Sequence, residues 1–414
     1  MSAIQDTPEW IRSIPASWRL SPVGALFDER KEVVSDSEFP ALSVTKRGVI
    51  PQLSDVAKSQ NGDSRKLVRS GDFVINSRSD RKGSSGISEQ DGSVSVVYTV
   101  LRPREHLDPA FVHHLLRSSA FQEEFYRWGS GIVADLWSTR YSAMKKIMLP
   151  TPSLDEQRVI AGYLNRETQK IDDLIAEQRE LIEILRERRR AVIDAKSLSG
   201  MDPLDPQKNL SWSSSALGYG FEVKLGKMLD SGKVRDDMAR NLPYIRAGNI
   251  QDSGLDIGNL NSMPFTREEE LKFNLECNDL LVVEGGAIGT SVVLEEDLPG
   301  VCFQKTVNRL RGTKDWNPRY YRYVLLAYRE RGILDILANK STIAHFTAEK
   351  LRGLRVPVPS IREQNEIAAD LDHATSRIDG LIAESEDLIA LSEERRAALI
   401  TAAVTGQIDV REGV

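Results

Sequence analysis

One stretch of the sequence occurs twice, and this internal repeat is the strongest constraint on the fold. The first copy, residues 150–193, begins Pro-Thr-Pro-Ser-Leu-Asp-Glu-Gln, and the second, residues 357–400, begins Pro-Val-Pro-Ser-Ile-Arg-Glu-Gln. The copies are offset by 207 positions and align without a gap, with about half of their positions identical. Such a period is too long for a solenoid, whose repeats have roughly 20–50 residues. The sequence therefore predicts two related halves, each a globular segment followed by one copy of this stretch.

Each copy has the start signal of a long helix. Ser153 and Glu156 form the capping-box pattern directly after two prolines, and Ser360 and Glu363 repeat it. We interpret these four residues as structural caps and not as chemistry. The first copy then runs to Ala195 with Gly162 as its single glycine and no proline. A helix of some 40 residues, roughly 60 Å long, follows from this pattern.

The predicted helices carry a single apolar stripe, so each needs a partner. In the first copy the stripe consists of Ile160, Leu164, Ile171, Leu174, Ile175, Leu181, Ile182, Leu185 and Val192. Because a globular segment separates the copies, an antiparallel pair of the two helices is the simplest packing, with approximate two-fold symmetry within one chain. Gly200 and Gly406 are the expected C-terminal stops.

The segments before the helices predict mixed α+β structure. In residues 1–149 we expect strands near 39–44, 72–76, 93–101 and 146–150, and one helix over 109–128 that starts at Asp108-Pro109. Residues 201–356 follow the same plan more loosely, with Asn317-Pro318 in the place of Asp108-Pro109. The frame is retained while the loops differ, which is the pattern of one recognition module with two different targets.

Composition narrows the class of protein without identifying it. With 40% hydrophobic and 28% charged residues the chain is able to form real cores. The two cysteines favour a reducing compartment, and no apolar run approaches a membrane span, so we expect a cytoplasmic protein. The net charge of −6 resides mainly in residues 357–414, where 5 Lys and Arg oppose 12 Asp and Glu. The near-neutral globular segments permit DNA binding but do not predict it.

The repeat resembles the specificity (S) subunits of type I DNA restriction-modification systems. The resemblance rests on the Pro-x-Pro-Ser-x-x-Glu-Gln entries, the Ile-Asp and Leu-Ile repeats, and the ending Ala-Ala-Val-Thr-Gly-Gln-Ile-Asp at 402–409. It implies target recognition domains at 1–149 and 201–356, and conserved-region helices at 150–200 and 357–414, the latter with the C-terminal tail. The implied fold is α+β, with both domains joined by an antiparallel coiled coil in a pseudo-two-fold duplication.

The same resemblance implies a non-catalytic subunit that reads a bipartite site in double-stranded DNA. The implied partners are two methyltransferase subunits and restriction translocase/nuclease subunits. No cofactor is expected in this chain, whereas S-adenosylmethionine, ATP and Mg are expected on the partners. The alternative is a coiled-coil scaffold that joins protein partners and never binds DNA.

The strongest candidate for DNA contact is the loop at 76–86, which follows a predicted strand and has three cations within five residues. A solvated polar loop is the competing interpretation. Weaker candidates precede each long helix or are isolated basic positions, each open to interpretation as surface charge. The full set of predicted DNA contacts is Lys46, Arg47, Ser77, Arg78, Arg81, Lys82, Ser84, Trp137, Arg140, Arg246, Asn249, Lys305, Lys340, Ser341, Thr342 and His345.

Other patterns have simpler interpretations. The arginines at 188–190 and 395–396 are expected on a solvated or partner-facing side, paired with neighbouring Glu at helical spacing. The glycine-rich loop at 284–291 lacks the Lys of a P-loop. The five histidines show no metal-binding spacing, and neither a Gly-x-Ser-x-Gly motif nor an Asn-Pro-Pro-Tyr type of methyltransferase motif occurs. We therefore predict no catalytic residue and no metal site.

Overall fold

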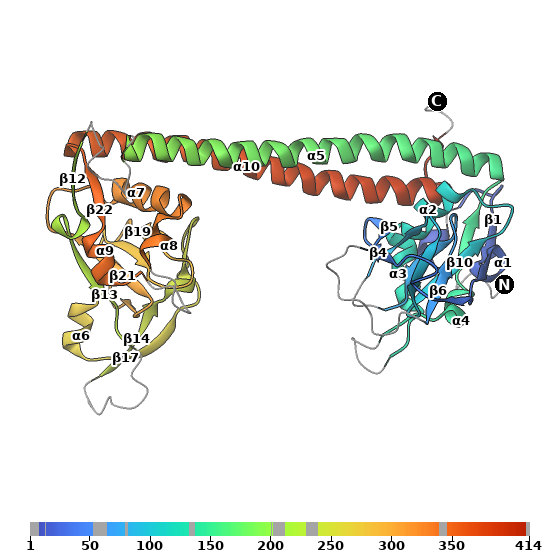
Figure 1. Ribbon diagram of the computed structural model, residues 1–414, viewed down its shortest axis with the longest axis horizontal. Helices are drawn as coiled ribbons and strands as arrows, with labels where there is room; N and C mark the ends of the chain where they lie inside the picture. Colours follow the sequence, from blue (N-terminus) through green and yellow to red (C-terminus); the bar gives the residue numbers. More distant parts are fainter. Residues whose placement is uncertain are drawn as a thin grey trace. The chain divides into compact units, whose positions relative to one another are not determined.

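A computed structural model describes the chain from residue 8 to residue 410, apart from 13, 53–63, 79–81, 132–136, 200, 202–211, 229–238 and 339–345. The chain divides into two compact units. Unit 1 comprises residues 1–178 and 386–414, and unit 2 comprises residues 179–385. Each unit thus combines one globular segment with a part of each long helix (Figure 1).

Unit 1 is built on a four-stranded antiparallel sheet of order β2-β10-β7-β8, with β3-β6-β9, β4-β5 and β1-β11 as smaller sheets. Phe73 and Ile75 of the central strand β7 pack with Phe111 and Phe121 of the covering helices. The elements are η1 (Glu9–Ile11), β1 (Arg19–Pro22), α1 (Val23–Leu26), β2 (Phe27–Glu29), β3 (Val33–Val34), β4 (Leu42–Thr45), β5 (Gly48–Pro51), β6 (Arg65–Val68), β7 (Phe73–Asn76), β8 (Ser85–Ile87), β9 (Gly92–Ser95), β10 (Tyr98–Pro103), α2 (Pro109–Arg117), α3 (Ser119–Arg127), α4 (Tyr141–Met144) and β11 (Met148–Thr151).

Unit 2 repeats this plan. Its four-stranded antiparallel sheet has the order β13-β21-β18-β19, and β12-β22 matches β1-β11. The elements are β12 (Ser213–Ala216), η5 (Leu217–Tyr219), β13 (Phe221–Leu225), β14 (Arg240–Ile245), η6 (Ala247–Asn249), β15 (Ile250–Gln251), β16 (Gly254–Leu255), β17 (Asn261–Phe265), α6 (Arg267–Lys272), β18 (Leu280–Val283), β19 (Ser291–Val293), β20 (Cys302–Phe303), β21 (Val307–Gly312), α7 (Pro318–Glu330), α8 (Ile333–Leu337), α9 (Ala348–Gly353) and β22 (Arg355–Val358).

The repeat forms the two long helices, α5 (Leu154–Leu198, 45 residues) and α10 (Ile361–Val404, 44 residues). Their starts are capped as predicted: the backbone N–H of Glu156 donates to Ser153 Oγ, and the N–H of Glu363 donates to Ser360 Oγ, both at 3.3 Å. At the end of α10, Gly406 has φ +69°, the left-handed conformation expected of a C-terminal stop. Gly200, the other predicted stop, lies outside the described residues.

Within each unit the long helices pair in antiparallel fashion. In unit 2, Arg189 of α5 pairs with Asp379 of α10 and Lys196 pairs with Asp370, both at 2.8 Å. Residue numbers rise along one helix as they fall along the other, which fixes the antiparallel sense. The expected pairing of the arginine runs with Glu of their own helix is therefore wrong for Arg189. Its guanidinium reaches a carboxylate of the facing helix instead.

Two local expectations are also wrong. The single helix expected over 109–128 is two helices, because Ser118 lies in an extended conformation (ψ 147°) and its Oγ accepts from the N–H of Phe121 as the cap of α3. The single strand expected over 93–101 is split between β9 and β10, which belong to different sheets and are separated by a turn at 96–97.

Candidate nucleic-acid interface

A buried glutamine fixes each recognition segment to its long helix. Gln157, the last residue of the first entry motif, is 1% exposed. Its Oε1 accepts from the backbone N–H of Asp108 (2.9 Å), the cap of α2, and its Nε2 donates to the carbonyl oxygen of Pro152 (3.0 Å). Gln364 makes the same contacts with the N–H of Asn317 and the carbonyl of Pro359, both at 2.9 Å. The sequence analysis missed this role of the two glutamines.

A second matched contact lies about two turns further along each long helix. His114 Nε2 of α2 donates to Asn165 Oδ1 of α5 at 2.7 Å, and the Tyr323 hydroxyl of α7 donates to Asp372 Oδ1 of α10 at 2.7 Å. Within the repeat alignment Asn165 corresponds to Asp372. The geometry of attachment is thus preserved, while the side chains that carry it differ.

In unit 1 two of the predicted segments lie against each other. Arg78 follows β7 and forms an isolated antiparallel bridge with Ser138, and the N–H of Thr139 donates to the carbonyl of Ser77 (2.9 Å). Arg78 and Arg140 are exposed. The segments at 76–78 and 137–140 therefore present two arginines from one surface region.

The other predicted contacts of unit 1 have different surroundings. Lys46 and Arg47 are exposed in the turn between β4 and β5, and Lys82 is exposed with its Nζ 5.3 Å from the ring centre of Tyr126. Ser77, Ser84 and Trp137 are more enclosed: Ser77 Oγ donates to the carbonyl of Val97, Ser84 is 7% exposed, and Trp137 Nε1 donates to the carbonyl of Tyr126. Arg81 lies outside the described residues.

In unit 2, Arg246 and Lys305 come together. The parallel pairing of β14 with β20 ends at Ile245 and Phe303, and both cations follow these strand ends as exposed residues. The N–H of Ala247 donates to Thr306 Oγ1 (3.0 Å), which holds the two turns together. Asn249 is 5% exposed, and its amide bonds the Arg246 N–H and the Asp256 carbonyl, so it positions this turn. Lys340, Ser341, Thr342 and His345 lie outside the described residues.

Exposure and charge separate the predicted contacts into exposed cations and more enclosed side chains, the latter being Ser77, Ser84, Trp137 and Asn249. Among the exposed cations, Arg78, Arg140, Arg246 and Lys305 follow strand ends or lie next to them, where side chains are able to reach a DNA groove or backbone. Within the described ranges no group of three His, Cys, Asp or Glu has the arrangement of a metal site, and no helix there is long and apolar enough to cross a membrane.

Comparisons with known proteins define the class of this fold. Residues 209–388 match the model of the type I restriction modification DNA specificity domain. The chain is 24% identical over 321 residues to the type I restriction enzyme StySPI specificity subunit of Salmonella potsdam, covering 74% of this chain and 67% of that subunit. It is 19% identical over 397 residues to the putative MjaX specificity subunit of Methanocaldococcus jannaschii, covering 92% and 87%.

Solved structures show the same fold. A structure described as the basis of complex assembly and conformational transition of the type I R-M system has a TM-score of 0.74 at 17% identity, covering 95% of this chain and 99% of the other. The HsdS subunit from Thermoanaerobacter tengcongensis has a TM-score of 0.55 at 17% identity, covering 95% and 98%. These likenesses confirm the α+β fold with two domains joined by long helices.

The fold and the comparisons agree on one class of protein that this chain is similar to, the specificity subunits of type I restriction-modification systems. The resemblance to specificity subunits of type I restriction-modification systems is confirmed, and residues 209–388 are a DNA specificity domain of that kind. The relatives are named as specificity subunits of restriction enzymes, which agrees with the prediction that this chain is not itself an enzyme. The finding favours DNA recognition over a scaffold that never binds DNA.

Proposed function

We propose that the chain reads a bipartite DNA site, with residues 1–149 recognising one half-site and residues 201–356 recognising the other. The long helices set the gap between the half-sites. The observation that carries this proposal is the duplicated attachment through Gln157 and Gln364, because it ties each recognition segment to the start of a long helix by the same hydrogen bonds. Two recognition segments that are attached to their helices in the same way are suited to bind two DNA sequence elements at a fixed spacing.

The affinity for DNA would come largely from phosphate contacts, and the specificity from base contacts. The exposed arginines Arg78 and Arg140 in unit 1, and Arg246 with Lys305 in unit 2, are the residues we propose for these contacts. Arginine is able to make paired hydrogen bonds to the edge of guanine in the major groove.

The chemistry would belong to other chains. We propose two methyltransferase subunits as partners of the long helices, with restriction translocase/nuclease subunits joining the complex. S-adenosylmethionine, ATP and Mg would bind those partners. The acidic character of residues 357–414 supports a surface that faces proteins and not DNA, because like charges repel the phosphate backbone.

The direct experiment is to co-express the chain with the methyltransferase encoded beside it and to map methylated adenines across the host genome. A split motif with a fixed gap is expected, and the methyltransferase expressed without this chain is the control. An active methyltransferase that yields no split motif would contradict the proposal. Co-purification gives a second measurement, since two methyltransferase copies per chain are expected.

A further inference from the structure

A basic pocket of about 400 Å³ lies in unit 1, where α10 meets the recognition segment. The β4–β5 turn, the residues before β8, the helices α2 and α3, and α10 all contribute to its wall. Its lining consists of Lys46, Lys82, Gly83, His113, His114, Arg117, Gln122, Arg396 and Ile400. Four of these residues are cations and none is a carboxylate.

Half-buried Arg117 organises this basic pocket. One guanidinium nitrogen donates to His113 Nε2 at 2.7 Å, and the other donates to the carbonyl oxygen of Lys46. Arginine has donors only, so His113 Nε2 must be an acceptor and the imidazole is neutral. Burial, with Arg117, His114 and Arg396 acting in the same direction, lowers the pKa of His113 to about 3. The His113 imidazole is therefore uncharged near neutral pH, and the positive charge of the pocket comes from its lysines and arginines.

The positive charge of the basic pocket is only partly compensated. Arg396 pairs at 2.9 Å with Asp172, which is not among the residues that line the pocket. Burial lowers the pKa of Arg117, Arg396 lowers it further, and Asp172 opposes both. The ammonium of Lys82 lies over the face of Tyr126, and neither Lys46 nor Lys82 has a described carboxylate partner. Cations gathered around a concave surface without matching acids attract an anion.

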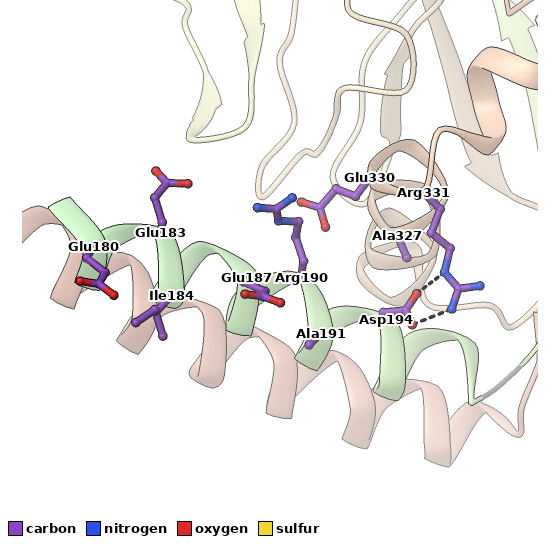
Figure 2. Close-up of a pocket in the computed structure, with 10 residues that line it drawn as sticks. All are labelled: Glu180, Glu183, Ile184, Glu187, Arg190, Ala191, Asp194, Ala327, Glu330 and Arg331. Carbon is purple, nitrogen blue, oxygen red and sulfur yellow. Dashed lines mark hydrogen bonds and ion pairs between the residues drawn. The ribbon is translucent and has the colours of Figure 1, made fainter.

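The corresponding junction of unit 2 has the opposite character. Figure 2 shows the carboxylates of Glu183, Glu187 and Glu330 along α5 and α7, and Asp194 paired with Arg331. The position equivalent to Arg117 in α7 is Leu326, counted from the helix-start residues Asp108 and Asn317. Among the described residues, the junction of α5 with α7 thus has no basic pocket like that of unit 1, so this pocket does not follow from the duplicated frame.

We propose that the basic pocket of unit 1 binds a phosphate group, held by Lys46, Lys82 and Arg117. A phosphate supplies acceptor oxygens for the ammonium groups of Lys46 and Lys82 and for the N–H groups of Arg117 that do not bond His113 or the Lys46 carbonyl. Charge-assisted hydrogen bonds of this kind are stronger than those between neutral groups. Two sources offer this chemistry: a backbone phosphate of bound DNA or a free phosphorylated small molecule. The DNA source rests on the proposed function, whereas the free source does not.

The first measurement is isothermal titration of the full chain with inorganic phosphate at low ionic strength. We expect one saturable site. Arg117→Gln should weaken it at least about tenfold, since it removes a charge-assisted hydrogen bond to the phosphate. Lys46→Gln and Lys82→Gln change exposed side chains, so they test the pocket even if Arg117→Gln fails to fold. Lys146→Gln, at an exposed lysine of unit 1 outside the lining, is the matched control and should leave the affinity unchanged.

The second measurement identifies the source. With the methyltransferase complex and DNA, each lost phosphate contact should reduce the slope of log affinity against log salt concentration by about 0.9. A reduced slope in Lys46→Gln and Lys82→Gln identifies a DNA phosphate, and Lys146→Gln, an exposed lysine outside the pocket, controls for net charge. Phosphate binding with an unchanged slope identifies a free phosphorylated ligand.

No saturable phosphate binding together with an unchanged salt slope would overturn the proposal. That result is distinguishable from a failure of the proposed function, because adenine methylation at a split motif would still be observed. Conversely, phosphate binding that depends on Lys46 and Lys82 would stand even if no split motif were found.

Discussion

Arg396 of α10 forms an ion pair with Asp172 of α5 (2.9 Å), and this pair is the repeat-related counterpart of Arg189 with Asp379 (2.8 Å). Asp172 and Asp379 are separated by 207 positions, and so are Arg189 and Arg396. The first pair lies within unit 1 and the second within unit 2. Each half of the repeat thus supplies one arginine and one aspartate, and the same contact forms twice between the same two helices.

These ion pairs should contribute mainly to the alignment of α5 with α10 and only a little to the stability of the protein. Their side chains are between 20% and 50% exposed, and partly exposed ion pairs contribute about 0.2–1 kcal/mol. Arg396→Ala should lower the free energy of unfolding by that amount. The exchange of charges, Arg396→Asp with Asp172→Arg, should recover most of it. A double-mutant cycle by urea unfolding measures the coupling, and no recovery in the exchanged protein would contradict this account.

Much of this helix pair was predictable from the sequence, whereas the contacts of Gln157 and Gln364 were not. A serine followed three residues later by Glu specifies a helix start locally, so Ser153 and Ser360 could be assigned as caps. A glutamine in the first turn of a helix looks solvated, and its burial depends on a recognition segment that folds over it. The recurrence of Gln at the same place in both copies was the available signal.

In the candidate site, too, local features were predictable from the sequence and tertiary contacts were not. The strand before Arg78 was predictable from its apolar run, which placed the following cations at a strand end. The bridge between Arg78 and Ser138 joins segments 60 positions apart and follows from tertiary packing. Likewise, the chain breaks at Ser118 because this residue caps α3 and does not extend α2. The spacing of apolar residues does not reveal such a break.

Loss of the buried glutamine should destabilise the protein strongly. Gln364→Ala leaves the N–H of Asn317 and the carbonyl of Pro359 without their partner, and each buried unsatisfied group costs about 1–3 kcal/mol. We expect a loss of about 2–4 kcal/mol in the free energy of unfolding. Gln169→Ala, an exposed glutamine of α5, is the matched control. A loss below about 0.5 kcal/mol, typical of surface changes, would show that the contact is dispensable.

Arg78→Ala and Arg246→Ala should act on different half-sites. If each arginine reads a base, its loss should reduce discrimination at that position by about 1–3 kcal/mol and leave the other half-site unaffected. Binding to DNA duplexes in which one half-site at a time is altered provides the measurement. An equal loss at both half-sites for either variant would indicate damage to folding or to partner binding instead of lost recognition.

His113 should make the stability of the protein pH-dependent. Its pKa in the folded state is lowered from 6.5 to about 3, so the unfolded chain binds an additional proton at intermediate pH. This contribution to stability is fully present above about pH 6.5 and is lost as the pH falls towards 3. Between pH 7 and 5 we expect it to decrease by about 1–2 kcal/mol. In His113→Gln this part of the pH dependence should be absent, and an identical profile in both proteins would contradict the assignment.

Lengthening the long helices together should lengthen the gap between half-sites. Because the helices are antiparallel, an insertion in α5 between residues 176 and 188 requires an equal insertion in the facing part of α10 to maintain the pairs of Arg189 with Asp379 and Arg396 with Asp172. Seven residues, close to two turns, add about 10 Å, or about three base pairs at 3.4 Å each. Both half-site sequences should stay the same, since neither recognition segment is altered. Mapping of methylated adenines would measure the gap. If it retained its original length while methylation persisted, the helices would not be the element that sets the spacing.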